Sequence, residues 1–202
     1  MKYIHKKSGE PDELTAHKRA ATLNWQPTYN NLDKKPIKQA LMHEQGEICC
    51  YCESRLDVND SHIEHLIPQS DPACDPLDYG NMLCSCLSNL KKGEPRHCGV
   101  HKGNHILPVT PLDARCERLF DYTADGAILP AANSEEARES IAILQLDIPK
   151  LRAKRRDAIA PFLDGTLSSQ EFDDFVNGYL QKDAHGRFSP FHTTIARIFT
   201  NG

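Results

Sequence analysis

The chain has 202 residues, of which 39% are hydrophobic and 26% are charged, a composition typical of a globular protein. Its formal net charge of −4 excludes a broadly polybasic nucleic-acid binder, so any such contact needs a local basic patch, a partner or a metal site. No apolar run approaches the roughly 20 residues that cross a bilayer, and the stretch MKYIHKKSGEPDEL lacks the apolar core of a secretory signal. We therefore expect a cytoplasmic protein without a membrane segment.

The first part of the chain, residues 1–48, predicts a helical segment that packs on the rest of the protein. Helical spacing of apolar residues predicts helices over 11–22 and 37–48, and Gly46 fits a helix C-cap. Between them, residues 24–36 are rich in Asn and Pro and predict a loop.

The middle of the chain, residues 49–130, predicts a small fold organised by a metal ion. Cysteine, histidine, proline and turn residues replace the helical pattern for much of this segment. We expect a strand over 61–68, a strand or loop over 78–93, and a hairpin over 115–131 with Asp-Gly as its turn.

The last part, residues 131–202, predicts a helical lobe. Asn133 is the expected N-cap of a helix over 133–146, with a glutamate at capping-box spacing. Two further helices are expected over 148–163 and 168–180.

Four of the eight cysteines have the spacing of a zinc site. Cys49-x-x-Cys52 forms a tight knuckle that directs two thiolates at one ion. The second pair must come from downstream, where Cys86 and Cys98 are the best candidates and Cys84 competes. Four thiolates around tetrahedral zinc make a closed arrangement. We therefore expect a structural Zn²⁺ site.

Alternatives to this assignment remain. His97 or His101 could replace one sulfur. The remaining thiols, Cys50, Cys74 and Cys116, have no evident ligand role and are interpreted as packing residues. A disulfide framework is a further alternative, but disulfides do not persist in the reducing compartment expected here.

The stretch DSHIEHLIPQ, residues 60–69, predicts a reaction centre. In a strand His62 and Glu64 share one face, while Ile63 and His65 share the other. At a twisted strand end, however, Glu64 could hold a divalent cation while His65 takes a proton from water. The alternative is an exposed polar strand that binds no metal.

These motifs occur in an order that resembles the HNH endonuclease family. The resemblance is closer to its PtuB-type proteins, the nuclease subunits of Septu anti-phage systems and of some retron systems, and covers roughly the first half of the chain. It implies an α+β fold with a zinc-stapled ββα-metal core, flanking N-terminal helices and a C-terminal helical lobe. The matching residues are Glu64, His65, Pro68, Asn81, Cys86, Cys98, Lys102 and Gly103.

The resemblance also implies roles for individual residues. His65 would be the general base, Glu64 would ligate a catalytic Mg²⁺ or Mn²⁺, and Asn81 would hold the base-bearing strand and orient His65 through a hydrogen bond. In many relatives the residue after the second downstream cysteine contributes to the metal. Here that residue is Gly99, which has no side chain, and His101 is the nearest substitute.

Other charged residues near these motifs are candidate contacts to nucleic acid. His62, on the Glu64 face, is a further candidate ligand. The basic run over residues 150–156 could follow phosphates, dock a partner, or simply face solvent. The candidate phosphate contacts are Lys91, Lys92, Arg96 and Lys102.

The expected function is that of an HNH endonuclease, a phosphodiester hydrolase in anti-phage defence. The resemblance implies a DNA or RNA substrate, a PtuA-type ATPase subunit as partner and, in retron systems, a reverse transcriptase with its DNA. One rival is a non-catalytic zinc-stapled adaptor that binds nucleic acid or protein, which Gly99 and the weak basic footprint favour. A thiol redox protein is disfavoured because no thioredoxin-like βαβ pattern surrounds the Cys49-x-x-Cys52 motif.

Overall fold

The computed structural model describes residues 1–6, 9–163 and 165–200, and this part of the chain combines helices with two small antiparallel sheets. The α+β class expected from the sequence is therefore confirmed. The α-helices are α1 (Asp12–Arg19), α2 (Lys34–Glu44), α3 (Cys98–Lys102), α4 (Glu135–Leu144), α5 (Pro149–Ile159), α6 (Ser169–Leu180) and α7 (His192–Phe199). The strands are β1 (Ser61–His65), β2 (Met82–Cys86), β3 (Phe120–Tyr122) and β4 (Ile128–Pro130). Short 3-10 turns cover Tyr29–Asn31, Tyr79–Asn81, Cys116–Arg118, Ala131–Asn133 and Ala160–Leu163.

The strands β1 and β2 form the antiparallel pair on which the candidate site is built. Glu64 is opposite Leu83 and His62 is opposite Ser85 in its register. The chain then reaches α3, which packs against β2. Strands β3 and β4 form the predicted hairpin, and Gly126 in its turn has a positive φ of 86°.

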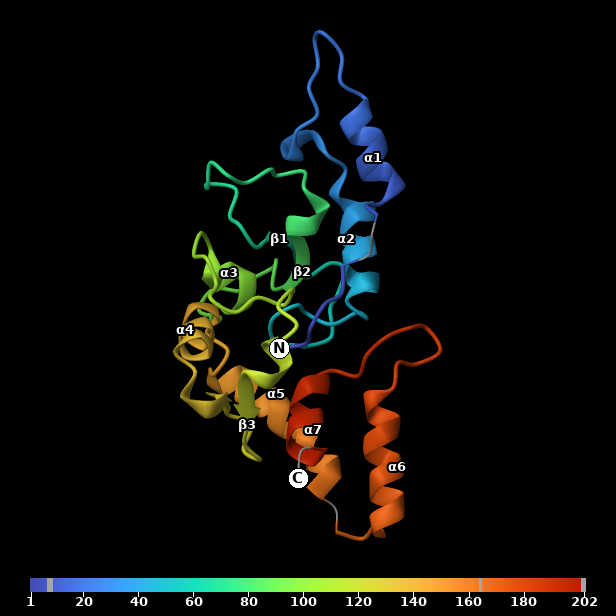
Figure 1. Ribbon diagram of the computed structural model, residues 1–202, viewed down its shortest axis with the longest axis vertical. Coiled ribbons are helices and arrows are strands. Elements are labelled where there is room, and N and C mark those ends of the chain that lie inside the picture. The colour runs from blue at the N-terminus through green and yellow to red at the C-terminus, as the bar shows by residue number, and fades with distance from the viewer. Residues whose placement is uncertain (7–8, 164, 201–202) are drawn as a thin grey trace.

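The elements are spread along one long axis. In Figure 1, α1 and α2 lie at the upper end, the β1–β2 pair and α3 lie in the middle, and α6 and α7 lie at the lower end. The main hydrophobic core joins α1, α2, the β1–β2 region and α4, whereas a smaller cluster joins the C-terminal helices. The smaller cluster consists of Ile159, Phe162, Val176 and Ile195. No helix among the described residues is long and apolar enough to cross a membrane.

The end of α2 fixes the position of β2. Gln45 is buried, and its amide donates to the carbonyls of Ile48 at 3.0 Å and Cys84 at 2.9 Å. Its carbonyl oxygen accepts from the backbone N–H of Cys84 at 2.7 Å. Because one side chain satisfies three buried backbone groups, it fixes the end of α2 against strand β2.

The helix boundaries differ from the predicted ones for local reasons. Helix α2 begins three residues before the predicted start, because Asp33 caps it and Pro36 fits within a first helical turn. The N-cap of α4 is Ser134, whose hydroxyl accepts from the Ala137 N–H at 3.2 Å, and not Asn133, which has a left-handed φ of 58°.

The basic run on α5 is largely used inside the protein. Arg155 is buried and donates to the carbonyls of Gly126 at 2.6 Å and Leu146 at 2.8 Å. Lys150 and Arg152 form ion pairs with acidic residues of this chain. Three of the five basic residues of this run therefore have partners within the chain, whereas Lys154 and Arg156 are exposed.

Candidate functional site

The four cysteines expected to bind zinc lie together. Their sulfur atoms all lie within 4.8 Å of one another, so the group could hold a metal ion such as zinc. Cys49 and Cys52 come from the turn before β1, Cys86 ends β2, and Cys98 begins α3. One ion at this point would tie the knuckle, the strand pair and the short helix to each other.

The chemistry of the four thiols also suits a cation. Burial alone would raise the pKa of Cys49, but hydrogen bonds from neighbouring thiols outweigh it and hold the pKa well below its usual value. Hydrogen bonding with Cys49 raises the pKa of Cys86, and burial raises that of Cys98. Hydrogen bonding with Cys49 would raise the pKa of Cys52, but hydrogen bonds with Cys86 and Cys98 outweigh it and lower the pKa to about 6. Two thiolates are thus favoured, and a divalent cation would remove the repulsion between them.

The alternatives to this quartet are placed nearby but not within it. Cys84 lies outside the group, and burial raises its pKa to about 12. His97 is buried with its Nδ1 3.1 Å from the Cys98 sulfur, where it can donate a hydrogen bond to that sulfur. His97 is therefore placed to hydrogen-bond the sulfur of Cys98 and is not itself a member of the group.

Next to this group, Glu64 is held by a buried lysine. Lys102 Nζ lies 2.9 Å from Glu64 Oε1, and the lysine side chain is fully buried. The hydroxyl of Tyr51 donates to the same oxygen at 3.2 Å. Burial alone would raise the pKa of Glu64, but the contacts with His62 and Lys102 outweigh it and keep the pKa below its usual value. The carboxylate is therefore ionised at neutral pH.

Glu64 also lines a hollow at the protein surface. His62 Nε2 lies 3.4 Å from Glu64 Oε2. The hollow has a volume of about 250 Å³. It is lined by His62, Ile63, Glu64, His65, Pro68, Gln69, Gly99, Gly103 and Asn104.

The imidazole of His65 is oriented by two neighbours. Its Nε2 lies 3.0 Å from the Pro76 carbonyl, which can only accept, so Nε2 carries the proton and donates. Its Nδ1 is then an acceptor and receives a hydrogen bond from the Gln69 amide at 3.2 Å. Burial lowers the pKa of His65 below its usual value, so the neutral ring is favoured near pH 7.

Asn81 holds the chain just after β1 but does not touch the His65 ring. Its carbonyl oxygen accepts from the Ile67 N–H at 2.8 Å, and its amide donates to the Ile67 carbonyl at 2.9 Å. The expectation that Asn81 fixes the base-bearing segment fits these contacts. The expected hydrogen bond to His65 is wrong, because Pro76 and Gln69 occupy the two ring nitrogens.

Two other predicted site residues are placed differently from the expectation. His101 is exposed and does not line the hollow; its Nδ1 lies 2.8 Å from the Ile143 carbonyl. Lys102 is fully buried, so it is not a contact to nucleic acid as predicted. The other three predicted phosphate contacts, Lys91, Lys92 and Arg96, are exposed in the loop before α3.

The sequence reasoning missed several parts of the site. Gln69 and the Pro76 carbonyl come from a loop whose path no local pattern predicts. One feature of the sequence could have indicated that Lys102 is buried. Lys102 lies four residues after Cys98 and therefore on the same face of a helix. A lysine on the face that carries a metal ligand is expected to point inward.

Two known proteins are similar in sequence to this chain. No family model matches the chain. A protein of Vibrio cholerae serotype O1 biovar El Tor, named "Retron Vc95 putative HNH endonuclease", is 31% identical over 134 residues, or 62% of this chain and 64% of that protein. The Septu protein PtuB of Bacillus thuringiensis is 27% identical over 134 residues, or 61% of this chain and 49% of that protein.

The resemblance drawn from the sequence is confirmed by these relatives. The chain is similar to HNH nuclease proteins of the Septu and retron type, and it spans less than two thirds of the length of each relative.

Proposed function

We propose that this chain is a metal-dependent HNH nuclease that hydrolyses phosphodiester bonds in anti-phage defence. The names of the two relatives support a nuclease of a defence system. One observation of the structure carries the proposal further: Glu64 and His65 line the same hollow. Glu64 Oε2 lies beside His62, and His65 Nδ1 is an acceptor nitrogen.

The proposed metal ions follow from the donor atoms. Four thiolates suit a structural Zn²⁺, and a carboxylate oxygen beside an open hollow suits Mg²⁺ or Mn²⁺ with several waters. The catalytic cation would stabilise the charge that develops on the phosphate and the leaving oxygen, by several kcal/mol in general experience.

The remaining roles, proton transfer and positioning, belong to side chains of the protein. His65 takes a proton from the attacking water at Nδ1, because its Nε2–H is committed to the Pro76 carbonyl. Lys102 keeps Glu64 ionised and also donates to the His65 carbonyl at 2.9 Å, which fixes the strand end that carries both residues. Asn81 holds the following turn through Ile67.

The fold proposed for this centre is the ββα-metal core, formed by β1, β2 and α3. Their order along the chain and the cysteine group that joins their ends support it. We retain the proposed division into an N-terminal segment (1–48), a nuclease core (49–130) and a C-terminal lobe (131–202). A PtuA-type ATPase is the proposed partner, with a reverse transcriptase and its DNA in a retron system.

A non-catalytic adaptor is the second candidate function. Lys102 already neutralises Glu64, and an ion pair of this kind is sufficient to explain a buried glutamate without any catalytic metal. The adaptor would still need the cysteine group for folding.

Cleavage assays separate the two candidates. The full chain, loaded with zinc, alone and together with proteins that copurify from its host, is incubated with plasmid DNA or RNA, with and without added Mg²⁺ or Mn²⁺. We expect metal-dependent cutting that disappears in Glu64→Gln and His65→Ala, while zinc content and circular dichroism stay unchanged; glutamine keeps an oxygen acceptor for the buried Lys102 ammonium. Unchanged cutting in His65→Ala would discard the assigned base, and no cutting by any mixture would favour the adaptor.

A further inference from the structure

Position 99 requires glycine because the side chains of His62 and Glu64 lie too close to its Cα for a Cβ atom to fit, and not because of its backbone conformation. A Cβ at this position would lie 2.3 Å from Glu64 Oε2 and 2.7 Å from His62 Nε2. Gly99 does not have the positive φ that would itself favour glycine. The space that a ligand side chain of residue 99 would occupy is therefore filled by His62 and Glu64.

His62 is poorly satisfied in its present contacts. His62 lies two residues before Glu64 on β1, so both side chains project from the same face of the strand. Its Nε2 has only the 3.4 Å contact with Glu64 Oε2, and its buried Nδ1 has no hydrogen-bond partner among the described residues. A cation between His62 Nε2 and Glu64 Oε2 would bind both of these atoms.

The geometry fits one shared ion. Two ligand atoms at metal distances of about 2.0–2.2 Å from one ion are commonly about 3 to 3.5 Å apart, and His62 Nε2 and Glu64 Oε2 are 3.4 Å apart. The other oxygen of Glu64 is committed to Lys102 and Tyr51, which leaves Oε2 as the ligand atom. The adjoining hollow of about 250 Å³ has room for water ligands and a phosphate oxygen.

We propose that His62 and Glu64 Oε2 together hold the catalytic divalent cation, with His62 in place of the side chain that Gly99 lacks. The inference rests on the proposed function, because it names the ligands of the same site. Because Mg²⁺ is bound through oxygen ligands, an imidazole ligand disfavours it, and Mn²⁺ is the ion chosen for the test.

Binding of Mn²⁺ to the zinc-loaded full chain tests this assignment without relying on activity. Free Mn²⁺ is measured by electron paramagnetic resonance during titration. We expect His62→Ala and His62→Gln to weaken Mn²⁺ binding by at least about tenfold, with unchanged zinc content and circular dichroism. His105→Ala is the matched control, since His105 is exposed and does not line the hollow.

The outcomes separate this inference from the proposed function. Wild-type affinity in both His62 variants, with loss in Glu64→Gln, would overturn the role of His62 and leave the nuclease proposal standing. Mn²⁺ binding that depends on His62 in a chain that never cuts would support the site and count against the nuclease. No Mn²⁺ binding by the wild-type chain would overturn both.

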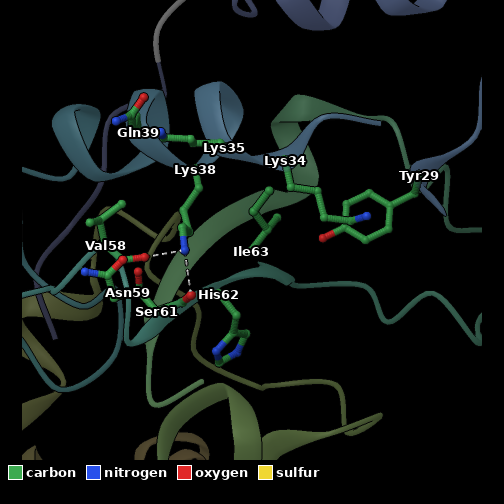
Figure 2. A pocket seen from close by; sticks show the side chains of 10 residues that line it. All are labelled: Tyr29, Lys34, Lys35, Lys38, Gln39, Val58, Asn59, Ser61, His62 and Ile63. Atoms are coloured by element: carbon green, nitrogen blue, oxygen red, sulfur yellow. Dashed lines mark hydrogen bonds between the residues drawn. The ribbon is translucent and has the colours of Figure 1, made fainter. Parts of the chain in front are cut away.

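A different observation concerns a basic groove beside the same strand. A hollow of about 700 Å³ lies between α2 and β1 and opens to solvent (Figure 2). Its lining contains three lysines and no carboxylate. The lining residues are Tyr29, Lys34, Lys35, Lys38, Gln39, Val58, Asn59, Ser61, His62 and Ile63.

The lysines in this groove have different roles. Lys38 donates to the Val58 carbonyl at 2.5 Å and the Ser61 carbonyl at 3.0 Å, so it holds the backbone at the start of β1 in place (Figure 2). Lys34 lies over the Tyr29 ring, 4.6 Å from its centre. Lys35 also lines the groove, and no acidic lining residue competes for these ammonium groups.

His62 and Ile63 line both hollows, so the groove lies next to the Glu64–His65 site. We infer, on the basis of the proposed nuclease function, that the groove takes the sugar–phosphate backbone of the substrate strand next to the cut, with Lys34 and Lys35 as phosphate contacts. Such contacts are not sequence-specific and are weakened by salt.

Fluorescence anisotropy with labelled DNA and RNA oligonucleotides, on the zinc-loaded chain without added Mg²⁺ or Mn²⁺, tests the groove. We expect Lys34→Gln/Lys35→Gln to weaken binding by at least about tenfold and to reduce the salt dependence by about two charges. Lys154→Gln/Arg156→Gln is the control with the same change in charge, at exposed positions on α5. Equal loss in the two pairs, or no loss in the groove pair, would overturn the inference, and the DNA and RNA probes show which backbone is preferred.

Discussion

Lys102 and Glu64 form a buried ion pair, with the lysine Nζ 2.9 Å from Glu64 Oε1 and the lysine side chain fully buried. The same ammonium donates to the carbonyl of His65 at 2.9 Å. Since Lys102 belongs to α3 and the other two residues belong to β1, one side chain connects the short helix to the strand end that carries the candidate site.

Removal of this ammonium is expected to destabilise the protein strongly. Lys102→Met keeps the length of the side chain but leaves the Glu64 carboxylate buried without its charge partner. Breaking one side of a buried pair typically costs about 3–5 kcal/mol. Urea unfolding followed by circular dichroism measures this loss, with Lys92→Met, at an exposed position, expected to change stability by less than about 0.5 kcal/mol.

The double variant Lys102→Met/Glu64→Gln should recover much of the lost stability, because no uncompensated charge remains. Equal instability of the single and double variants would mean that the lysine acts by packing and not by charge.

Loss of one cysteine of the quartet should unfold the core. Cys52→Ala removes one of four clustered sulfurs, and a structural zinc site carries about 10–16 kcal/mol of apparent binding free energy. That amount is comparable to the whole stability of a domain. Zinc content by mass spectrometry and the circular dichroism spectrum measure the result.

Cys116→Ala is the control for this prediction, since Cys116 is buried but lies outside the quartet. It should keep its zinc and its spectrum. A folded, zinc-free Cys52→Ala protein would contradict the structural role of the quartet.

Asn81 should matter for both stability and cutting. Asn81→Ala leaves the Ile67 N–H and carbonyl without the side chain that pairs with them. The loss of these partners costs about 1–3 kcal/mol. Because Ile67 lies two residues after His65, cutting should fall more than stability alone explains.

Thermal unfolding and initial cleavage rates of the same preparation measure the two effects. Asn89→Ala serves as a comparison, because Asn89 is exposed and its side-chain amide donates to the carbonyl of Asn59, in the loop before β1. A normal cleavage rate in Asn81→Ala would show that the turn after β1 does not position the base.

Local patterns in the sequence predict the parts of this molecule that local chemistry decides. The Cys49-x-x-Cys52 knuckle, the β1 strand and the Asp-Gly hairpin turn depend on short-range geometry, and the structure has each of them. The burial of Lys102 and Arg155 depends on which distant carbonyls and carboxylates the fold brings near them. A basic residue is more often exposed, so composition alone assigns both to the surface incorrectly.

The ring of His65 gives a final prediction because Gln69 occupies its acceptor nitrogen. The Gln69 amide donates to Nδ1 at 3.2 Å, the position at which the proposed mechanism needs a water molecule. The Pro76 carbonyl fixes the tautomer through Nε2 without help from Gln69. We therefore expect Gln69→Ala to retain cutting within about threefold or to increase it, whereas His65→Ala loses about 10²- to 10⁴-fold. Single-turnover cleavage rates measure both. A loss in Gln69→Ala as large as that in His65→Ala would mean that the amide, and not water, is required at Nδ1.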